Sequence, residues 1–210
     1  MAAGGRPVRL GVLFSGGGRT LENLAAKCSA GDIPGSVALA VSSHPEAGGV
    51  DLARKLGIPC RVADHRALGD GLSGAIASFL DEAEVDLVCL AGFIRMFAVP
   101  PGREGRVLNI HPALLPSFGG RGFYGDRVHR AVLASGARFS GCTVHYVTEE
   151  YDRGPIILQR VVPVVTGDTV ESLAARVFAE ECIAYPEAIR LHAEGRLKVE
   201  GGRVALIPAE

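Results

Sequence analysis

The chain has 210 residues, of which 48% are hydrophobic and 21% are charged, and its formal net charge at pH 7 is -1. A single domain over residues 1–210 is therefore expected, and without a run of Lys or Arg the chain is not expected to bind nucleic acid. The five cysteines form no CxxC pair, and no apolar run matches a membrane span or an export signal, so we expect reduced thiols and a cytoplasmic protein without a membrane anchor.

In the first half of the chain, short apolar runs alternate with longer segments of helical periodicity. Strands are predicted at residues 8–14, 37–43, 60–63, 86–92 and 106–110, and crossover helices at residues 20–30, 48–57 and 72–83. The strand runs are apolar throughout rather than alternating, which is typical of parallel strands covered on both faces. The pattern predicts an α/β fold with a Rossmann-like, mostly parallel sheet flanked by helices.

The pattern changes in the C-terminal half of the chain. Residues 126–136 predict a helix, and two longer, half-alternating runs joined by a turn indicate antiparallel strands at residues 138–148 and 155–164. Residues 169–195 predict one long helix kinked at Pro186, since an interior proline removes a backbone hydrogen bond. The segment 197–207 predicts a hairpin that turns at two glycines.

A glycine-rich segment, SGGGRTL at residues 15–21, joins the first predicted strand to the first predicted helix. Such a turn brings backbone N–H groups and a helix N-terminus close to a ligand, which suits phosphate. Arg19 and Thr20 add a positive charge and a hydroxyl group. The dinucleotide fingerprint requires a third glycine where Leu21 stands, so a full NAD site is disfavoured. A tight turn without a ligand is the alternative.

The segment LNIHPALLPSF at residues 108–118 follows the end of the fifth predicted strand. In an extended chain alternate residues point the same way, so Asn109 and His111 share one face. The amide can donate a hydrogen bond to a developing oxyanion, and the imidazole can carry a proton near neutral pH. Pro112 and Pro116 are expected to stiffen the following loop. The alternative is a histidine that satisfies backbone carbonyls at a strand end.

A third segment, TVHYVTEEYDRGP at residues 143–155, repeats the alternation with Thr143 and His145 on one face. It ends in Asp152, whose carboxylate in a fixed turn can orient an imidazole and raise its pKa. Sequence spacing does not establish that this carboxylate meets the strand-end pair. The histidines lack metal-ligand spacing and no cysteine pair assists, so no metal site is predicted; His129 is interpreted as a surface or packing residue.

Five segments together resemble the folate-dependent phosphoribosylglycinamide formyltransferases of purine synthesis. They are VLFSGGGRTLENL, LVCLAGFIRMF, RVLNIHPALLPSF, GCTVHYVTEEYDRGPIILQ and AEECIAYP, in consistent order between about Val8 and Leu197. The resemblance implies the formyltransferase fold and direct transfer of a formyl group from the co-substrate 10-formyltetrahydrofolate to the amine of glycinamide ribonucleotide, without a metal or a covalent enzyme intermediate. It also implies small-molecule partners only, and a monomer or homodimer.

The resemblance further implies a role for each matching residue. The N-terminal half would bind the ribonucleotide, and the C-terminal half would bind folate and carry out catalysis. Catalysis falls to Asn109, His111 and Asp152. Ribonucleotide binding falls to Gly18, Arg19, Thr20 and Glu181. Folate binding falls to Ile94, Arg95, Met96, Phe97, Asn109, Thr148, Glu149, Glu150 and Tyr151.

The sequence departs from this family's pattern in two places. Gly69 stands where relatives often carry an arginine near the folate tail, and Arg66 is a candidate substitute. The glycine-rich loop 119–125 is longer than in some relatives and is either a mobile cover or a plain connection.

Four alternative functions stay open. Methionyl-tRNA formyltransferase needs a tRNA-binding domain, formyltetrahydrofolate hydrolase an extra N-terminal domain, and the others are a non-catalytic nucleotide-binding module and an NAD-dependent reductase.

Overall fold

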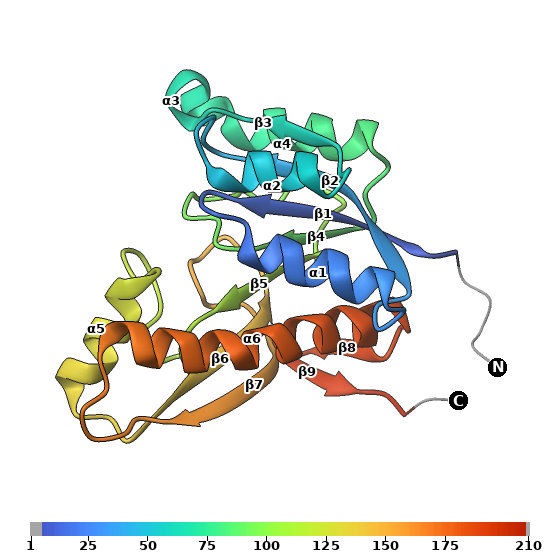
Figure 1. Cartoon of the computed structure of the whole chain (residues 1–210). Helices are drawn as coiled ribbons and strands as arrows, with labels where there is room; N and C mark the ends of the chain where they lie inside the picture. Colours follow the sequence, from blue (N-terminus) through green and yellow to red (C-terminus); the bar gives the residue numbers. More distant parts are fainter. Residues whose placement is uncertain (1–5, 209–210) are drawn as a thin grey trace.

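The computed structural model describes residues 6–208, and its centre is a seven-stranded sheet (Figure 1). The strands lie in the order β3-β2-β1-β4-β5-β6-β7. Their bounds are β1 Val8–Phe14, β2 Gly35–Ser42, β3 Cys60–Val62, β4 Leu87–Leu90, β5 Val107–His111, β6 Phe139–Tyr146 and β7 Ile156–Pro163. Strands β1 to β5 pair in parallel, whereas β6 and β7 pair antiparallel with their neighbours. This confirms the predicted mostly parallel sheet with antiparallel strands in the C-terminal half.

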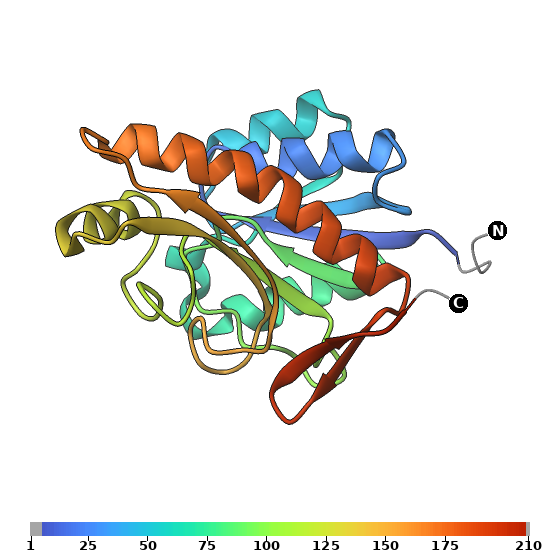
Figure 2. The same cartoon turned by 90° about the horizontal axis from the view of Figure 1, so that it is seen from below.

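Helices cover both faces of the sheet (Figure 2). They are α1 Arg19–Ser29, α2 Gly48–Lys55, α3 His65–Leu68, α4 Leu72–Glu82, α5 Asp126–Ser135 and α6 Val170–Ala193. Side chains of α1, α2, α5 and α6 share one core with Val12, while α4 shares the other core with Leu13. Neighbouring residues of β1 therefore point into opposite cores, which explains why its sequence is apolar without alternation.

The long helix α6 runs through Pro186 as one element, as predicted. It begins with a capping box, in which the Thr169 hydroxyl accepts from the Ser172 N–H and the Ser172 hydroxyl accepts from the Thr169 N–H. In its middle, the fully buried Tyr185 directs its hydroxyl at the carbonyls of Leu90 and Leu108, 3.0 Å from each. The helix is thereby tied to β4 and β5, close to the ends of both strands.

The predicted elements are present with ends within two residues of those expected, and the hairpin β8 Leu197–Glu200 and β9 Arg203–Leu206 lies outside the main sheet. Two short elements were missed: α3 and the 3₁₀ turn Gly69–Gly71. The Asp64 side chain caps α3 by accepting from the Arg66 N–H. A helix of four residues is too short to produce a periodic pattern in the sequence.

Candidate active site

A cavity of about 930 Å³ lies at the carboxyl ends of β1, β4 and β5. Its walls come from residues 16–20, 90–97, 109–112 and 120–126, from His129 of α5, from residues 145, 147, 148 and 150–152, and from one face of α6. From β1, the chain adds β2 and β3 on one side of the sheet and then β4 and β5 on the other side. The cavity therefore lies where the strand order reverses. Open α/β sheets bind their ligands at this place.

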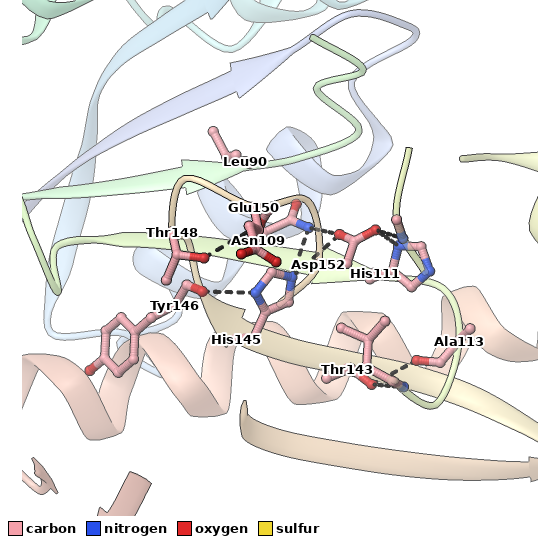
Figure 3. Close-up of polar contacts among 12 residues, drawn as sticks. Leu90, Asn109, His111, Ala113, Thr143, His145, Tyr146, Thr148, Glu150 and Asp152 are labelled. Atoms are coloured by element: carbon pink, nitrogen blue, oxygen red, sulfur yellow. Dashed lines mark hydrogen bonds and ion pairs between the residues drawn. The ribbon is translucent and has the colours of Figure 1, made fainter. Parts of the chain in front are cut away.

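Asn109, His111 and Asp152 meet at this cavity (Figure 3). The Asn109 Nδ2 atom lies 3.4 Å from Asp152 Oδ1, and the His111 Nδ1 atom lies 3.5 Å from Asp152 Oδ2. One carboxylate therefore contacts both strand-end side chains. The sequence predicted that the amide and imidazole share a face, and the fold adds the carboxylate from a turn more than forty residues away.

His145 fixes the orientation of the Asn109 amide. The two residues are partners in the antiparallel register of β5 and β6. The Nδ1 atom of His145 lies 2.8 Å from the Tyr146 carbonyl and must donate to it, since a carbonyl can only accept. In the neutral ring, Nε2 then accepts from Asn109 Nδ2 at 3.1 Å. The second amide hydrogen of Asn109 makes only the long contact to Asp152, so it is the hydrogen available to a ligand.

Asp152 is held in an unusual backbone conformation. Its φ of 55° lies in the left-handed region, and its Oδ2 accepts from the Gly120 N–H at 2.8 Å. Burial alone would raise the pKa of this carboxyl, but the His145 ring, whose Nε2 atom lies 3.6 Å from Asp152 Oδ1, the charge of His111 and the Gly120 N–H hold the pKa below its usual value. Asp152 is therefore a carboxylate at neutral pH.

Both ring nitrogens of His111 face acceptors. Its Nε2 donates to the Phe118 carbonyl at 2.9 Å, and its Nδ1 faces the Asp152 carboxylate. Burial lowers the pKa of His111, while the charge of Asp152 and the bond to Phe118 raise it, and His145 lowers it further; the net shift is downward. The neutral ring consequently has an unprotonated Nδ1 beside a carboxylate, and a proton added there completes an ion pair.

Thr143 supports the loop after His111 rather than the cavity. Its fully buried hydroxyl donates to the Ala113 carbonyl at 2.7 Å and accepts from the Leu115 N–H at 3.0 Å (Figure 3). The Gln159 side chain also donates to this hydroxyl at 3.0 Å. Thr143 is not a lining residue, and its hydroxyl anchors the loop instead.

The glycine-rich segment forms one end of the cavity, as predicted. Helix α1 starts at Arg19 after Gly18, whose φ is 82° and where a Cβ would come within 2.9 Å of the Gly49 Cα. No side chain caps this helix start, so its first N–H groups are free for a ligand. Thr20 and Glu181 also line the cavity, and burial raises the pKa of Glu181 to about 7, against the lowering effect of the Arg19 charge.

The expected folate-binding residues also line the cavity, with one exception. Ile94, Arg95, Met96, Phe97, Thr148, Glu150 and Tyr151 line it. Glu149 is exposed and does not line it. Neither Gly69 nor Arg66 is a lining residue; the lining arginines are Arg19, Arg95 and Arg121. Residues 120–125 form a cavity wall, which favours a cover over a plain connection for this loop.

Comparison with known proteins identifies the family. The model of the family "Formyl transferase" matches residues 8–189. The chain belongs to this family. Among its relatives, "Phosphoribosylglycinamide formyltransferase, chloroplastic" of Arabidopsis thaliana is 44% identical over 207 residues, covering 96% of this chain and 71% of the relative. "Trifunctional purine biosynthetic protein adenosine-3" of Gallus gallus is 43% identical over 202 residues, covering 94% of this chain but 20% of that longer protein.

A solved structure supports the same conclusion. Glycinamide ribonucleotide transformylase 1 from Symbiobacterium toebii superimposes with a TM-score of 0.91 at 45% identity, covering 98% of this chain and 96% of the other. The expected formyltransferase fold is thereby confirmed. Within residues 6–208 of this formyl transferase, no helix is long and apolar enough to cross a membrane, and no three His, Cys, Asp or Glu residues are grouped to hold a metal ion.

Phe178 and His129 are among the cavity residues of this formyl transferase that sequence reasoning missed. Phe178 of α6 lines the cavity, and the Arg19 guanidinium stacks 4.2 Å from the centre of its ring. His129 of α5 is 5% exposed and also lines the cavity. Phe178 could have been found from helical spacing, since Ala174, Phe178 and Glu181 recur at intervals of four and three residues and share one helix face.

Proposed function

We propose that this formyl transferase transfers the formyl group of 10-formyltetrahydrofolate to the amine of glycinamide ribonucleotide in purine synthesis, releasing tetrahydrofolate. The observation that carries the proposal is the meeting of Asn109, His111 and Asp152 at one cavity. The glycine-rich segment and residues 94–97 both line that cavity. The activity named for the relatives supports the same reaction.

Asn109 would stabilise the developing oxyanion. Attack of a neutral amine on the formyl carbon builds negative charge on the formyl oxygen, and a preorganised donor there lowers the barrier. His145 holds one N–H of the Asn109 amide, leaving the other for the formyl oxygen. Because His145 already orients the amide, little reorganisation is required when the charge develops.

His111 would accept the proton of the attacking amine, with Asp152 stabilising the imidazolium that forms. The attacking nitrogen becomes positively charged and must lose a proton, which is later needed by the leaving nitrogen of the folate. The His111 ring is predominantly neutral because burial lowers its pKa, so it can accept. Asp152 lies 3.5 Å from Nδ1 and offsets the positive charge. The transfer is direct, without a covalent enzyme intermediate.

The two substrates would share this cavity within a single domain. Gly18, Arg19, Thr20 and Glu181 are proposed for the ribonucleotide. Residues 94–97 and the turn 148–151 are proposed for the folate, together with Asn109. The first group lies in the glycine-rich segment and on α6. The free N–H groups at the start of α1 and the Arg19 guanidinium can bind negatively charged groups of the ribonucleotide. The second group includes exposed Ile94 and Met96, which suit an apolar ring system.

A cytoplasmic location and a monomer or homodimer remain our predictions. The described structure contains five free cysteines, as a reducing compartment requires. The plant relatives' names place those proteins in chloroplasts, which is also compatible with free thiols. Fractionation of the source cells and sedimentation of the purified protein test these two points.

An absorbance assay for tetrahydrofolate formation tests the proposed reaction. Product should form only when both 10-formyltetrahydrofolate and glycinamide ribonucleotide are present, and release without the ribonucleotide would instead indicate a hydrolase. His111→Ala should lower kcat at least 100-fold, on the order expected for loss of an acid–base group. His44→Ala is the matched control, because His44 does not line the cavity. A wild-type rate in the purified His111 variant would refute the assignment.

A further inference from the structure

His129 is a buried imidazole in the cavity wall that the proposed mechanism does not use. It is 5% exposed, and its Nδ1 atom is closed off from solvent without a hydrogen-bond partner. Its Nε2 is not closed off, and it bonds to none of the residues that the structure describes. Buried polar groups in proteins are normally paired, and Nε2, the nitrogen of this ring that is not closed off, is the one that a ligand in the cavity can reach.

The position of His129 places it on the ribonucleotide side of the cavity. Helix α5 packs against α6, whose cavity-lining Phe178 and Glu181 lie beside Arg19 of the proposed ribonucleotide group. His129 is also close enough to His111 for the charge of one ring to lower the pKa of the other. The proposed folate residues come from the loop after β4, from β5 and from the turn after β6, none of which belongs to α5.

The surroundings of the ring determine which nitrogen carries the hydrogen. An N–H at the closed-off Nδ1 would lack an acceptor, whereas an N–H at Nε2 can reach a ligand in the cavity. Burial lowers the pKa of His129, partly opposed by the charge of Asp126 and reinforced by that of His111. The neutral ring with hydrogen on Nε2 is therefore the favoured form, and it offers one donor.

We propose that His129 is a substrate-binding residue whose Nε2–H donates a hydrogen bond to an oxygen of the phosphorylated ribose substrate, next to the reacting amine. The inference rests on the proposed function, because it takes the ribonucleotide as the ligand beside His129. The role of His129 differs from the roles of Asn109 and His111. A hydrogen bond made equally in the ground state and the transition state raises affinity for the substrate without changing the rate of the chemical step.

Two substitutions separate this hydrogen bond from packing. His129→Leu puts an apolar side chain of similar size in place of the imidazole and removes the donor. His129→Gln keeps an N–H donor close to the position of Nε2. The leucine variant should raise the KM for glycinamide ribonucleotide about tenfold, equivalent to about 1.4 kcal/mol, with kcat and the KM for 10-formyltetrahydrofolate unchanged. The glutamine variant should recover part of the affinity. Calorimetric titration with the ribonucleotide alone should give the same ranking.

Val132→Ala is the matched control on the same helix. Val132 is fully buried and does not line the cavity, so its truncation should lower the unfolding temperature and leave both KM values unchanged. Ribonucleotide affinity of His129→Leu within twofold of wild type, or an equal loss of affinity for both substrates, would overturn the inference. If the wild-type protein binds the ribonucleotide but transfers no formyl group, the proposed function fails while the titration still tests His129.

Discussion

The acid limb of the pH–rate profile is expected to depend on the Asp152 charge. The His111 Nδ1 atom lies 3.5 Å from Asp152 Oδ2, and the two side chains are 4% and 10% exposed. With an effective dielectric constant of about 20, two unit charges at this distance attract by about 4.7 kcal/mol, equivalent to about 3.5 pKa units. Neighbouring charges in proteins shift a pKa by about 1–3 units, so we take this range as the expected effect.

Asp152→Asn removes the charge but keeps an oxygen that can accept from the Gly120 N–H. Burial lowers the pKa of His111 and the Asp152 charge raises it, so loss of the charge lets burial lower the pKa further. The acid limb of kcat should therefore move to lower pH by about 1–3 units. The plateau rate should also fall about tenfold or more, because the imidazolium formed during transfer loses its counter-charge.

The measurement is kcat against pH at saturating concentrations of both substrates, so that the profile reports groups in the bound complex. Asp126→Asn is the control, since Asp126 affects the pKa of His129 rather than that of His111. An unchanged limb in Asp152→Asn, or a shift to higher pH, would refute the coupling between Asp152 and His111.

Four further substitutions test other contacts. Asn109→Ala should lower kcat about 100-fold or more without changing the unfolding temperature, because an oxyanion donor is lost. Thr143→Val should lower the free energy of unfolding by about 2 kcal/mol in urea titrations, since it leaves buried backbone groups unpaired. Tyr185→Phe should cost about 1 kcal/mol in the same measurement, through loss of the bonds to β4 and β5. Gly154→Ala should reduce soluble expression and lower the unfolding temperature, because a Cβ would overlap the Tyr146 carbonyl.

The sequence predicted the common face of Asn109 and His111 because that property is local. A strand points alternate side chains the same way, whatever packs against it. Their meeting with Asp152 was implied only by the family resemblance and not by residue spacing, because it depends on the antiparallel register that sets His145 opposite Asn109 and on the left-handed turn at Asp152. Neither the partner strand nor a positive φ at a non-glycine residue can be read from residue spacing.

The interpretations of Thr143 and His129 also show that local sequence patterns do not reveal which segments pack against a residue. Alternation correctly placed Thr143 on the face that His145 occupies, but the loop 113–115 covers that part of the face and takes up the hydroxyl. His129 was interpreted as a surface or packing residue because helical periodicity reveals which face is apolar, not what lies opposite it. Burial beside a cavity is a property of the assembled fold.

The hydrogen-bond pattern leaves one place in the cluster for the transferred proton. His145 donates from Nδ1 to the Tyr146 carbonyl and accepts at Nε2 from Asn109, so a second hydrogen on His145 would face the amide N–H and break that bond. Both rings lie beside the Asp152 carboxylate, with His145 Nε2 3.6 Å from Oδ1 and His111 Nδ1 3.5 Å from Oδ2, but no amide hydrogen occupies the His111 nitrogen. A proton received there turns a buried negative charge into a neutral ion pair. The network that orients the Asn109 amide therefore also directs the proton to His111, which couples oxyanion stabilisation to proton transfer through the Asp152 carboxylate.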